Sequence, residues 1–204
     1  MIKNIVFDYG GVLVDWNPHY VFDSWFGGDV EKADWFLQHI CNMEWNEQMD
    51  KGKPFSEGVA ELSARYPEWK TEIEMYYRDW IKMINPVPIA GMTGYVRELK
   101  ERGYKTYGLS NWAAETFALV RHRFEAFDLL DGMVVSGYEK TIKPEPRIFE
   151  ILFDRYCLTP GECVFIDDNA RNLAAARTMG MHTIQFTTKE ALEGPLESLL
   201  AERS

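Results

Sequence analysis

The stretch that most constrains the fold of this chain is residues 5–13, because an apolar run there ends abruptly in a carboxylate. Residues 5–7 have the character of a buried parallel strand, and Asp8 follows them directly. In an open α/β sheet, ligands bind beyond the carboxyl ends of the strands, and Gly10 and Gly11 would let the backbone turn sharply and approach a ligand. The stretch predicts that Asp8 lies at the edge of the sheet where ligands bind. A carboxylate that caps the following helix is the alternative.

Four further short apolar runs resemble buried strands, and helical patterns separate them. The runs cover residues 105–109, 132–135, 163–166 and 182–186. The helical patterns cover residues 94–102, 115–124, 147–156 and 173–179. Alternating strands and helices imply right-handed crossovers and a parallel sheet. We therefore predict an α/β fold, with a Rossmann-like parallel sheet flanked by helices.

Residues 16–83 have a different composition, rich in Trp, Phe, Met and charged residues at helical spacing. Helices are expected around residues 35–40, 58–66 and 71–83, with a break at Gly52-Lys53-Pro54. The aromatic stripe is expected to pack rather than to bind a cofactor. The sequence thus predicts an all-helical cap of residues 16–83, inserted into a core formed by residues 1–15 and 84–204.

Charge and composition exclude several classes of partner. The 204 residues carry a net charge of -10, with a pI of 4.9, which argues against nucleic acid and anionic membranes. No run approaches the ~18 apolar residues of a membrane span, and Asp8 comes too early for a signal peptide. Three cysteines without CxxC spacing indicate reduced thiols, and the histidines form no metal signature. We expect a cytoplasmic monomer or homodimer.

Polar or charged residues follow four of the predicted strands in order. They are Asp8 with Gly10, then Ser110-Asn111, then Lys143 in Lys-Pro-Glu-Pro, and finally Asp167-Asp168 with Asn172 behind them. Because the carboxyl ends of parallel strands meet at one edge, we expect all four groups to gather there. Each of these groups, taken alone, could be a helix cap or a surface turn. The occurrence of all four together favours a functional site.

These residue types suit one kind of chemistry. Three carboxylates at one site repel each other, and a hard divalent cation such as Mg²⁺, which prefers oxygen ligands, relieves that repulsion. A carboxylate can also act as a covalent nucleophile, as in aspartyl-phosphate chemistry. A hydroxyl, an amide and an ammonium can hold the oxygens of a phosphoryl group, whose transfer depends mostly on positioning and charge neutralisation. The set predicts a Mg²⁺ site for a small phosphorylated metabolite.

The motifs and their order resemble the haloacid dehalogenase-like superfamily, which consists mostly of phosphatases, over nearly the whole chain. One branch of this superfamily is most similar to the chain in three segments: Asp-Tyr-Gly-Gly-Val at residues 8–12, Ser110-Asn111 and residues 143–147. That branch contains bacterial α-glucose-1-phosphate phosphatase and the epoxide hydrolase N-terminal phosphatase domain. The resemblance implies that Asp8 is the nucleophile and a Mg²⁺ ligand, and that Gly10 offers its backbone carbonyl to the metal.

The resemblance also implies roles for the later motifs. Ser110 and Asn111 would bind phosphate, and Lys143 would neutralise both the nucleophile and the phosphate. Asp168 would bind Mg²⁺ directly, and Asp167 would reach it through water.

The chain departs from the family pattern at one position. Most phosphatases of the superfamily carry a second Asp two residues after the nucleophile, which protonates the leaving group and then activates water; here that residue is Gly10. General acid–base help contributes about 10²–10⁴ in rate. Either Asp15 takes over this role as a catalytic residue, or the substrate has a leaving group that needs little protonation, or the protein is a weakly active or non-catalytic binder.

The sequence favours a combination of the first two: a Mg²⁺-dependent phosphatase, with Asp15 in the acid and base role, that acts on a small phosphate ester with an activated leaving group, such as a sugar 1-phosphate. Trp112, and the cap residues Trp16 and Trp45, could stack on a sugar face, with packing as the alternative. A metal-independent 2-haloacid dehalogenase is the competing enzyme, and the acidic pair Asp167-Asp168 argues against it. A mutase is disfavoured because it too relies on the second Asp.

Overall fold

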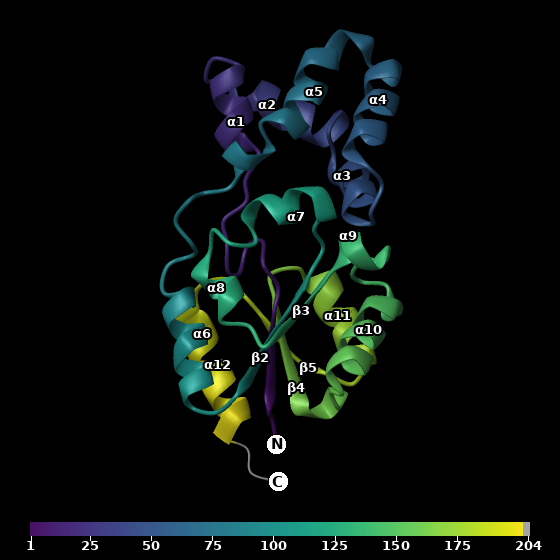
Figure 1. Cartoon of the computed structure of the whole chain (residues 1–204). Helices are drawn as coiled ribbons and strands as arrows, with labels where there is room; N and C mark the ends of the chain where they lie inside the picture. The colour runs from purple at the N-terminus through teal and green to yellow at the C-terminus, as the bar shows by residue number, and fades with distance from the viewer. Residues whose placement is uncertain (202–204) are drawn as a thin grey trace.

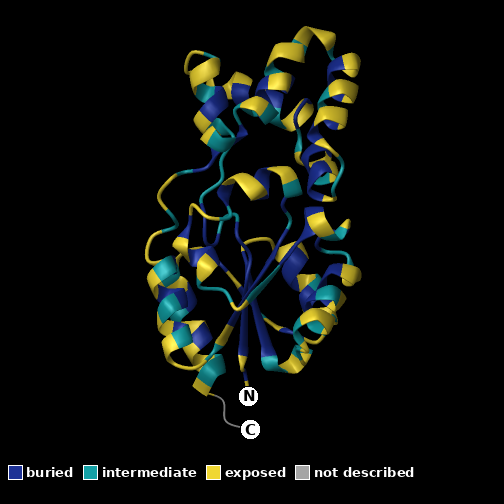
Figure 2. Ribbon diagram, in the orientation of Figure 1, coloured by how far each residue is buried: buried dark blue, intermediate teal, exposed yellow. Residues whose placement is uncertain are grey.

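Five parallel strands form the centre of the protein in the computed structural model, which describes residues 1–201 (Figure 1). They are β1 (Asn4–Phe7), β2 (Lys105–Ser110), β3 (Gly132–Val135), β4 (Cys163–Asp167) and β5 (His182–Gln185), in the order β3-β2-β1-β4-β5. In register, Val6 lies opposite Tyr107 on one side and Phe165 on the other. The sheet is largely buried (Figure 2), as its apolar runs require. All five predicted strands are confirmed.

Helices cover both faces of the sheet, as Figure 1 shows. One face carries α6 (Met92–Glu101) and α12 (Lys189–Ala201), and the other carries α10 (Pro146–Tyr156) and α11 (Ala170–Thr178). The helices predicted at 94–102, 147–156 and 173–179 are confirmed, with α11 beginning earlier. Helix α12 was not expected from the sequence, and it contains Pro195 in its interior. Burial of Leu192 and Leu196 holds this helix together in spite of that proline.

The helix predicted at 115–124 is shorter than expected. It consists of α7 (Ala114–Val120), followed by a turn and then α8 (Glu125–Asp128). Phe124 adopts extended backbone between them, is buried, and packs edge-on against Phe127 with ring centroids 5.8 Å apart. The turn therefore ends the helix early and directs the Phe124 ring into the core.

Residues 19–83 form only helices, which lie together beyond the carboxyl ends of the strands (Figure 1). In order they are α1 (His19–Trp25), α2 (Val30–His39), α3 (Met43–Asp50), α4 (Phe55–Arg65), η1 (Pro67–Trp69), α5 (Lys70–Arg78) and η2 (Trp80–Met83). The helices expected near 35–40, 58–66 and 71–83 correspond to α2, α4 and α5 with η2. The sequence analysis did not predict α1 or α3. We refer to residues 16–83 as the cap.

The chain enters and leaves the cap through two adjacent segments. Asn17 N–H donates to the Met83 carbonyl at 2.8 Å, and Asn85 N–H donates to the Asp15 carbonyl at 2.9 Å. Trp16 forms an isolated antiparallel bridge with residue 84 between these two bonds. We place the boundaries between core and cap at this crossing. Within residues 1–201, no helix has both the length and the apolar character needed to cross a membrane.

The packing of Tyr9 explains a glycine in the middle of β2. The Tyr9 ring is fully buried, stacked on Phe117 with centroids 5.8 Å apart and tilted against Phe127 at 4.7 Å. A Cβ atom at Gly108 would overlap this ring. The strand therefore carries glycine at residue 108 because the aromatic ring occupies the adjacent space.

We expect Gly108→Ala to lower the free energy of unfolding by about 1–3 kcal/mol, the usual cost of overpacking a core. Gly94→Ala is the matched control, because Gly94 lies within α6 and a Cβ atom there meets nothing within 4 Å. Alanine is favoured over glycine inside a helix by roughly 0.5–1 kcal/mol, so this control should stabilise the protein. Urea unfolding measures both changes, and effects of the same sign would contradict the packing argument.

Candidate active site

A pocket of about 400 Å³ lies where the carboxyl edge of the sheet meets the cap. The core side of its wall is mainly polar and charged: Asp8, Gly10, Gly11, Ser110, Asn111, Trp112, Lys143, Asp168, Asn169, Arg171 and Asn172. The cap side adds two tryptophans, one methionine and three polar or charged residues: Trp16, Met43, Asn46, Glu47, Asp50 and Trp80. Motifs far apart in the sequence therefore meet at one cavity that core and cap build together.

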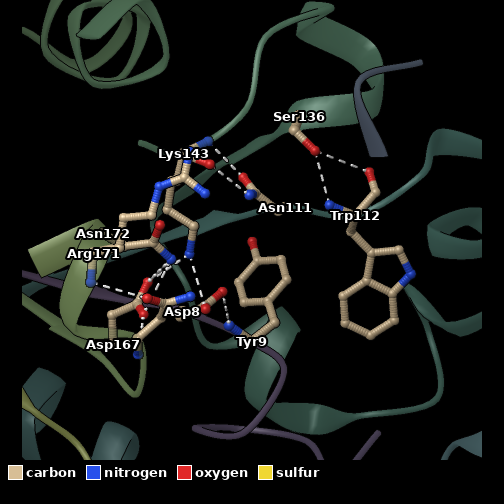
Figure 3. A network of polar contacts seen from close by, with 10 residues as sticks. Asp8, Tyr9, Asn111, Trp112, Ser136, Lys143, Asp167, Arg171 and Asn172 are labelled. Carbon is tan, nitrogen blue, oxygen red and sulfur yellow. Dashed lines mark hydrogen bonds and ion pairs between the residues drawn. The ribbon is translucent and has the colours of Figure 1, made fainter. Parts of the chain in front are cut away.

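Lys143 is a buried cation in the wall of this pocket. Its side chain is 1% exposed, and its ammonium lies 2.9 Å from Asp8 Oδ2 and 2.7 Å from Asp167 Oδ2 (Figure 3). Burial alone would lower the pKa of Lys143, but the two carboxylates overcome this effect and raise it. The ammonium is therefore charged at neutral pH and stands directly against the expected nucleophile.

Asn111, just after β2, holds the backbone that carries Lys143. Its Nδ2 donates to the Lys143 carbonyl at 2.9 Å, and the Lys143 N–H donates to Asn111 Oδ1 at 2.7 Å (Figure 3). Ser110 hydrogen-bonds the Asp8 carboxylate with its hydroxyl. Ser110 thus faces the place expected for phosphate, whereas the Asn111 side chain positions Lys143. Asn111 could therefore bind phosphate only through its backbone N–H or through the second hydrogen of its side-chain amide.

The two adjacent carboxylates after β4 have different surroundings. Both oxygens of Asp167 accept from Asn172 Nδ2, at 3.3 and 3.1 Å, and one also accepts from Lys143. Asp168 lines the pocket. Asp8, Asp167 and Asp168 each offer an oxygen within 4.8 Å of the others, a spacing and donor type that suit Mg²⁺. These three carboxylates and the Lys143 ammonium sum to two negative charges, which one divalent cation balances.

The mutual repulsion of these carboxylates acts on their pKa values. Burial raises the pKa of Asp8; the Lys143 ammonium opposes that rise and Asp167 adds to it. Burial, followed by the charge of Asp167, also raises the pKa of Asp168. A divalent cation beside them would favour the ionised form of both carboxyls.

The two glycines after Asp8 differ in what they permit. Gly11 has φ +76°, so its backbone favours glycine, and a Cβ atom there would displace the Asp168 carboxylate. A Cβ atom at Gly10 would meet nothing within 4 Å. The space beside Gly10 is therefore open, and packing does not explain the missing side chain.

The pocket brings together most of the residues predicted from sequence. Those in its wall are Asp8, Gly10, Ser110, Asn111, Trp112, Lys143 and Asp168, together with Trp16 from the cap. Asp167 lies behind them and contacts Lys143. Trp45 instead packs inside the cap, where its Nε1 donates to the Gly58 carbonyl at 3.2 Å and its ring meets Tyr76 edge-on at 5.1 Å. Stacking of Trp45 on a substrate is thus not supported.

Asp15 lies at the crossing between core and cap, and it is not part of the pocket wall that residues 1–201 form. Its Oδ2 accepts from the Tyr20 hydroxyl and from Asn85 Nδ2, the latter at 3.1 Å. These bonds fasten the two crossing segments to each other. The structure therefore gives Asp15 a place in the junction and does not bring it to Asp8.

One set of pocket residues was missed by the sequence analysis. Met43, Asn46, Glu47 and Asp50 all come from α3 and line the pocket. Their spacing of three, four and seven residues places them on one helical face. A polar face at this spacing was a usable signal, but it stood in a segment where no helix had been predicted.

Comparison with known proteins identifies the family. Residues 2–180 match the family described as haloacid dehalogenase-like hydrolase. The chain belongs to the haloacid dehalogenase-like hydrolases. The expected family and the expected fold class are thereby confirmed, and the protein is a hydrolase.

Individual relatives of this hydrolase span nearly its whole length. A sesquiterpene phosphatase of Aspergillus oryzae is 31% identical over 186 residues, covering 91% of this chain and 90% of its own. A D-ribitol-5-phosphate phosphatase of Bacteroides thetaiotaomicron is 26% identical over 196 residues, covering 91% and 92%. A haloacid dehalogenase family enzyme from the same bacterium, solved with magnesium and inorganic phosphate, matches the fold with a TM-score of 0.69. It shares 24% identity, and the match covers 93% of this chain and 96% of that one.

We expect Lys143→Met to lower the unfolding free energy of the hydrolase by about 3–5 kcal/mol, because two buried carboxylates lose their partner. Adding Asp167→Asn to that variant should recover part of the loss, since it removes one of the unpaired charges. The control is Lys3→Met, because Lys3 pairs with Glu162 at the surface and such pairs contribute at most about 1 kcal/mol. Urea unfolding measures all three variants, and similar losses at Lys3 and Lys143 would contradict the role of burial.

Asp50 predicts a decline of stability with rising pH. Burial, with Glu47 and Asp8 adding to it, raises the pKa of Asp50 from 3.8 to about 7. Between those values the folded protein binds more protons than the unfolded chain, so stability is lost as pH rises. We expect Asp50→Asn to flatten this decline in metal-free protein, and Glu44→Gln, at an exposed site on the same helix, to leave it unchanged. Urea unfolding at several pH values tests this, and an unaltered slope in Asp50→Asn would contradict it.

Proposed function

We propose that this hydrolase is a Mg²⁺-dependent phosphatase that cleaves a small phosphate ester through an aspartyl phosphate on Asp8. The proposal rests on two contacts of the Asp8 carboxylate. One of its oxygens contacts the Lys143 ammonium, and the carboxylate lies close enough to that of Asp168 for both to bind one metal ion. A nucleophile held between a fixed cation and a metal position suits attack on a phosphoryl group.

The chain offers a fitting set of donors for Mg²⁺. The carboxylates of Asp8 and Asp168 and the backbone carbonyl of Gly10 would hold the ion, with Asp167 acting through water. All of these donors are oxygen atoms, and the local charge of minus two matches the ion. When bound, Mg²⁺ supplies neutralisation of the charge on the phosphoryl oxygens.

The residues of the chain account for the remaining steps. Asp8 Oδ1 accepts the Tyr9 N–H at 2.7 Å, and Oδ2 faces Lys143, which together fix the carboxylate. Attack of an Asp8 oxygen on phosphorus breaks the bond to the leaving-group oxygen, while Ser110 and Lys143 hold phosphoryl oxygens. Water then attacks the phosphorus, and Asp8 departs as a carboxylate as inorganic phosphate is released.

For the substrate we propose a small hydroxylated phosphate ester, in the class of sugar or polyol phosphates. The support comes from the cap side of the pocket, where Asn46, Glu47 and Asp50 can hydrogen-bond hydroxyl groups and Trp16 can cover an apolar ring face. The relative that acts on D-ribitol 5-phosphate fits this chemistry. A wholly apolar chain, such as that of a terpenyl phosphate, would offer no hydrogen-bonding group to this polar face of the cap. A sugar 1-phosphate remains within the proposal.

We expect the protein to release phosphate in the presence of Mg²⁺, with the highest turnover on sugar or polyol phosphates. The test is a panel of sugar 1-phosphates, sugar 6-phosphates, ribitol 5-phosphate, acyl phosphates and p-nitrophenyl phosphate. Asp8→Asn should lower kcat at least about 10³-fold, because the covalent step is lost. Asp168→Asn should raise the Mg²⁺ concentration needed for half-maximal rate.

The same panel can contradict the proposal. Metal-independent release of halide from 2-chloropropionate, without phosphate release from any ester, would identify a dehalogenase instead. Binding of Mg²⁺ without turnover of any phosphate ester would indicate a binding protein.

A further inference from the structure

An alkoxide leaving group must be protonated as it departs, and Gly10, which has no side chain, cannot supply that proton. The leaving group of a polyol phosphate, or of a sugar phosphorylated at a primary hydroxyl, is a poor one, so an acid beside it should be worth about 10²–10⁴ in rate. The space beside Gly10 is open to the pocket, since a Cβ atom there would meet nothing within 4 Å. A proton donor for that space has to come from another part of the pocket wall.

We propose that Asp50, carried by the cap, is the general acid and base of the reaction in place of a residue at Gly10. This inference rests on the proposed phosphatase function and names a further catalytic residue for it. Asp50 is the last residue of α3 and lines the same pocket as Asp8 and Lys143, although it stands on the opposite, cap side.

The Asp50 carboxyl is held in place by groups from both layers. Its Oδ2 accepts from Asn46 Nδ2 at 2.9 Å, within α3. The backbone N–H of Ala113, in the segment after β2, also hydrogen-bonds this carboxyl. A neutral amide and a backbone N–H orient the group without a positive partner, so the carboxyl can both give up and regain a proton.

The backbone at Asp50 is fastened to the core. The Ser136 hydroxyl donates to the Asp50 carbonyl at 2.6 Å, and the Lys140 ammonium donates to the Gly52 carbonyl at 2.9 Å. Lys51 pairs with Glu145 at 2.5 Å next to them. These three contacts hold this turn of the cap against the core and so fix the position of the acid.

The surroundings of Asp50 favour its protonated form. The titratable groups that act on it among residues 1–201 are Glu47 of its own helix, Asp8 of the core and Tyr76 of α5. Burial and the first two carboxylates raise its pKa to about 7. Lys143, the buried cation of the pocket, is engaged with Asp8 and Asp167 instead.

The proton balance of the two steps follows. As Asp8 attacks phosphorus, the bond from phosphorus to the leaving-group oxygen breaks, and that oxygen takes the proton of the Asp50 carboxyl. The product alcohol leaves, and Asp50 is now a carboxylate. It accepts a proton from the attacking water as the water oxygen bonds to phosphorus and the bond to Asp8 breaks. Asp50 is protonated again, and phosphate is released.

The test compares substrates whose leaving groups differ in their need for a proton. For Asp50→Asn we expect kcat on ribitol 5-phosphate to fall at least about 10²-fold, in line with loss of an acid. The burst of p-nitrophenolate from p-nitrophenyl phosphate should fall less than tenfold, because that phenolate leaves without protonation. After this burst the phosphoenzyme should accumulate, since its hydrolysis has lost the base, and acid quenching with labelled phosphate detects it.

Two further variants keep the test decisive. Glu44→Gln, a charge removal at an exposed site of α3 outside the pocket, should retain the rate on both substrates. Gly10→Asp placed in the Asp50→Asn background should recover rate on ribitol 5-phosphate, because it restores a carboxyl to the open space. Thermal unfolding confirms that each variant is folded.

The outcomes separate this inference from the phosphatase proposal. If the wild-type protein turns over no phosphate ester, the proposed function itself is wrong. If it turns over ribitol 5-phosphate and Asp50→Asn loses rate equally on both substrates without phosphoenzyme, Asp50 is structural and the inference is overturned. The same conclusion follows if the leaving-group dependence appears in Asp15→Asn instead.

Discussion

The buried ammonium of Lys143 is the contact on which the functional edge of this protein depends. It lies within 3 Å of carboxylates that follow or end two different strands, Asp8 after β1 and Asp167 at the end of β4. Its own backbone is held by Asn111, which follows β2. One charge thus joins the ends of three neighbouring strands. Because both carboxylates are desolvated, each needs this partner, and the arrangement leaves Asp168 directed to the pocket.

The site divides its chemistry between two layers. The core supplies the rigid part: the Asp8 carboxylate, the Lys143 ammonium, the Ser110 hydroxyl and the Asp168 carboxylate, gathered at the carboxyl edge of a sheet with fixed register. The cap supplies one face of α3, with an amide and two carboxyl groups. Such a division keeps the phosphoryl chemistry constant while the residues that meet the rest of the substrate lie on a separate set of helices.

The core of the fold could be predicted from sequence because each strand is a short apolar run between recognisable breaks. The same local reasoning did not find α12, a helix that has Pro195 in its interior and that buries Leu192 and Leu196. The motif residues were found because strand ends converge in any parallel sheet. Asp15 and Asp50 show the limit: both are acidic residues near predicted breaks, and only tertiary structure decides which of them reaches the pocket.

The position of β1 in the sheet has a consequence for the synthesis of the chain. β1 is the central strand and is made first, yet its two partners begin only at residues 105 and 163. The whole cap leaves the ribosome before the first of these partners exists. The apolar residues 5–7 must therefore wait without a neighbouring strand, and closing such long loops is slow. Until β4 emerges, one edge of β1 stays unpaired, and unpaired apolar strands favour aggregation.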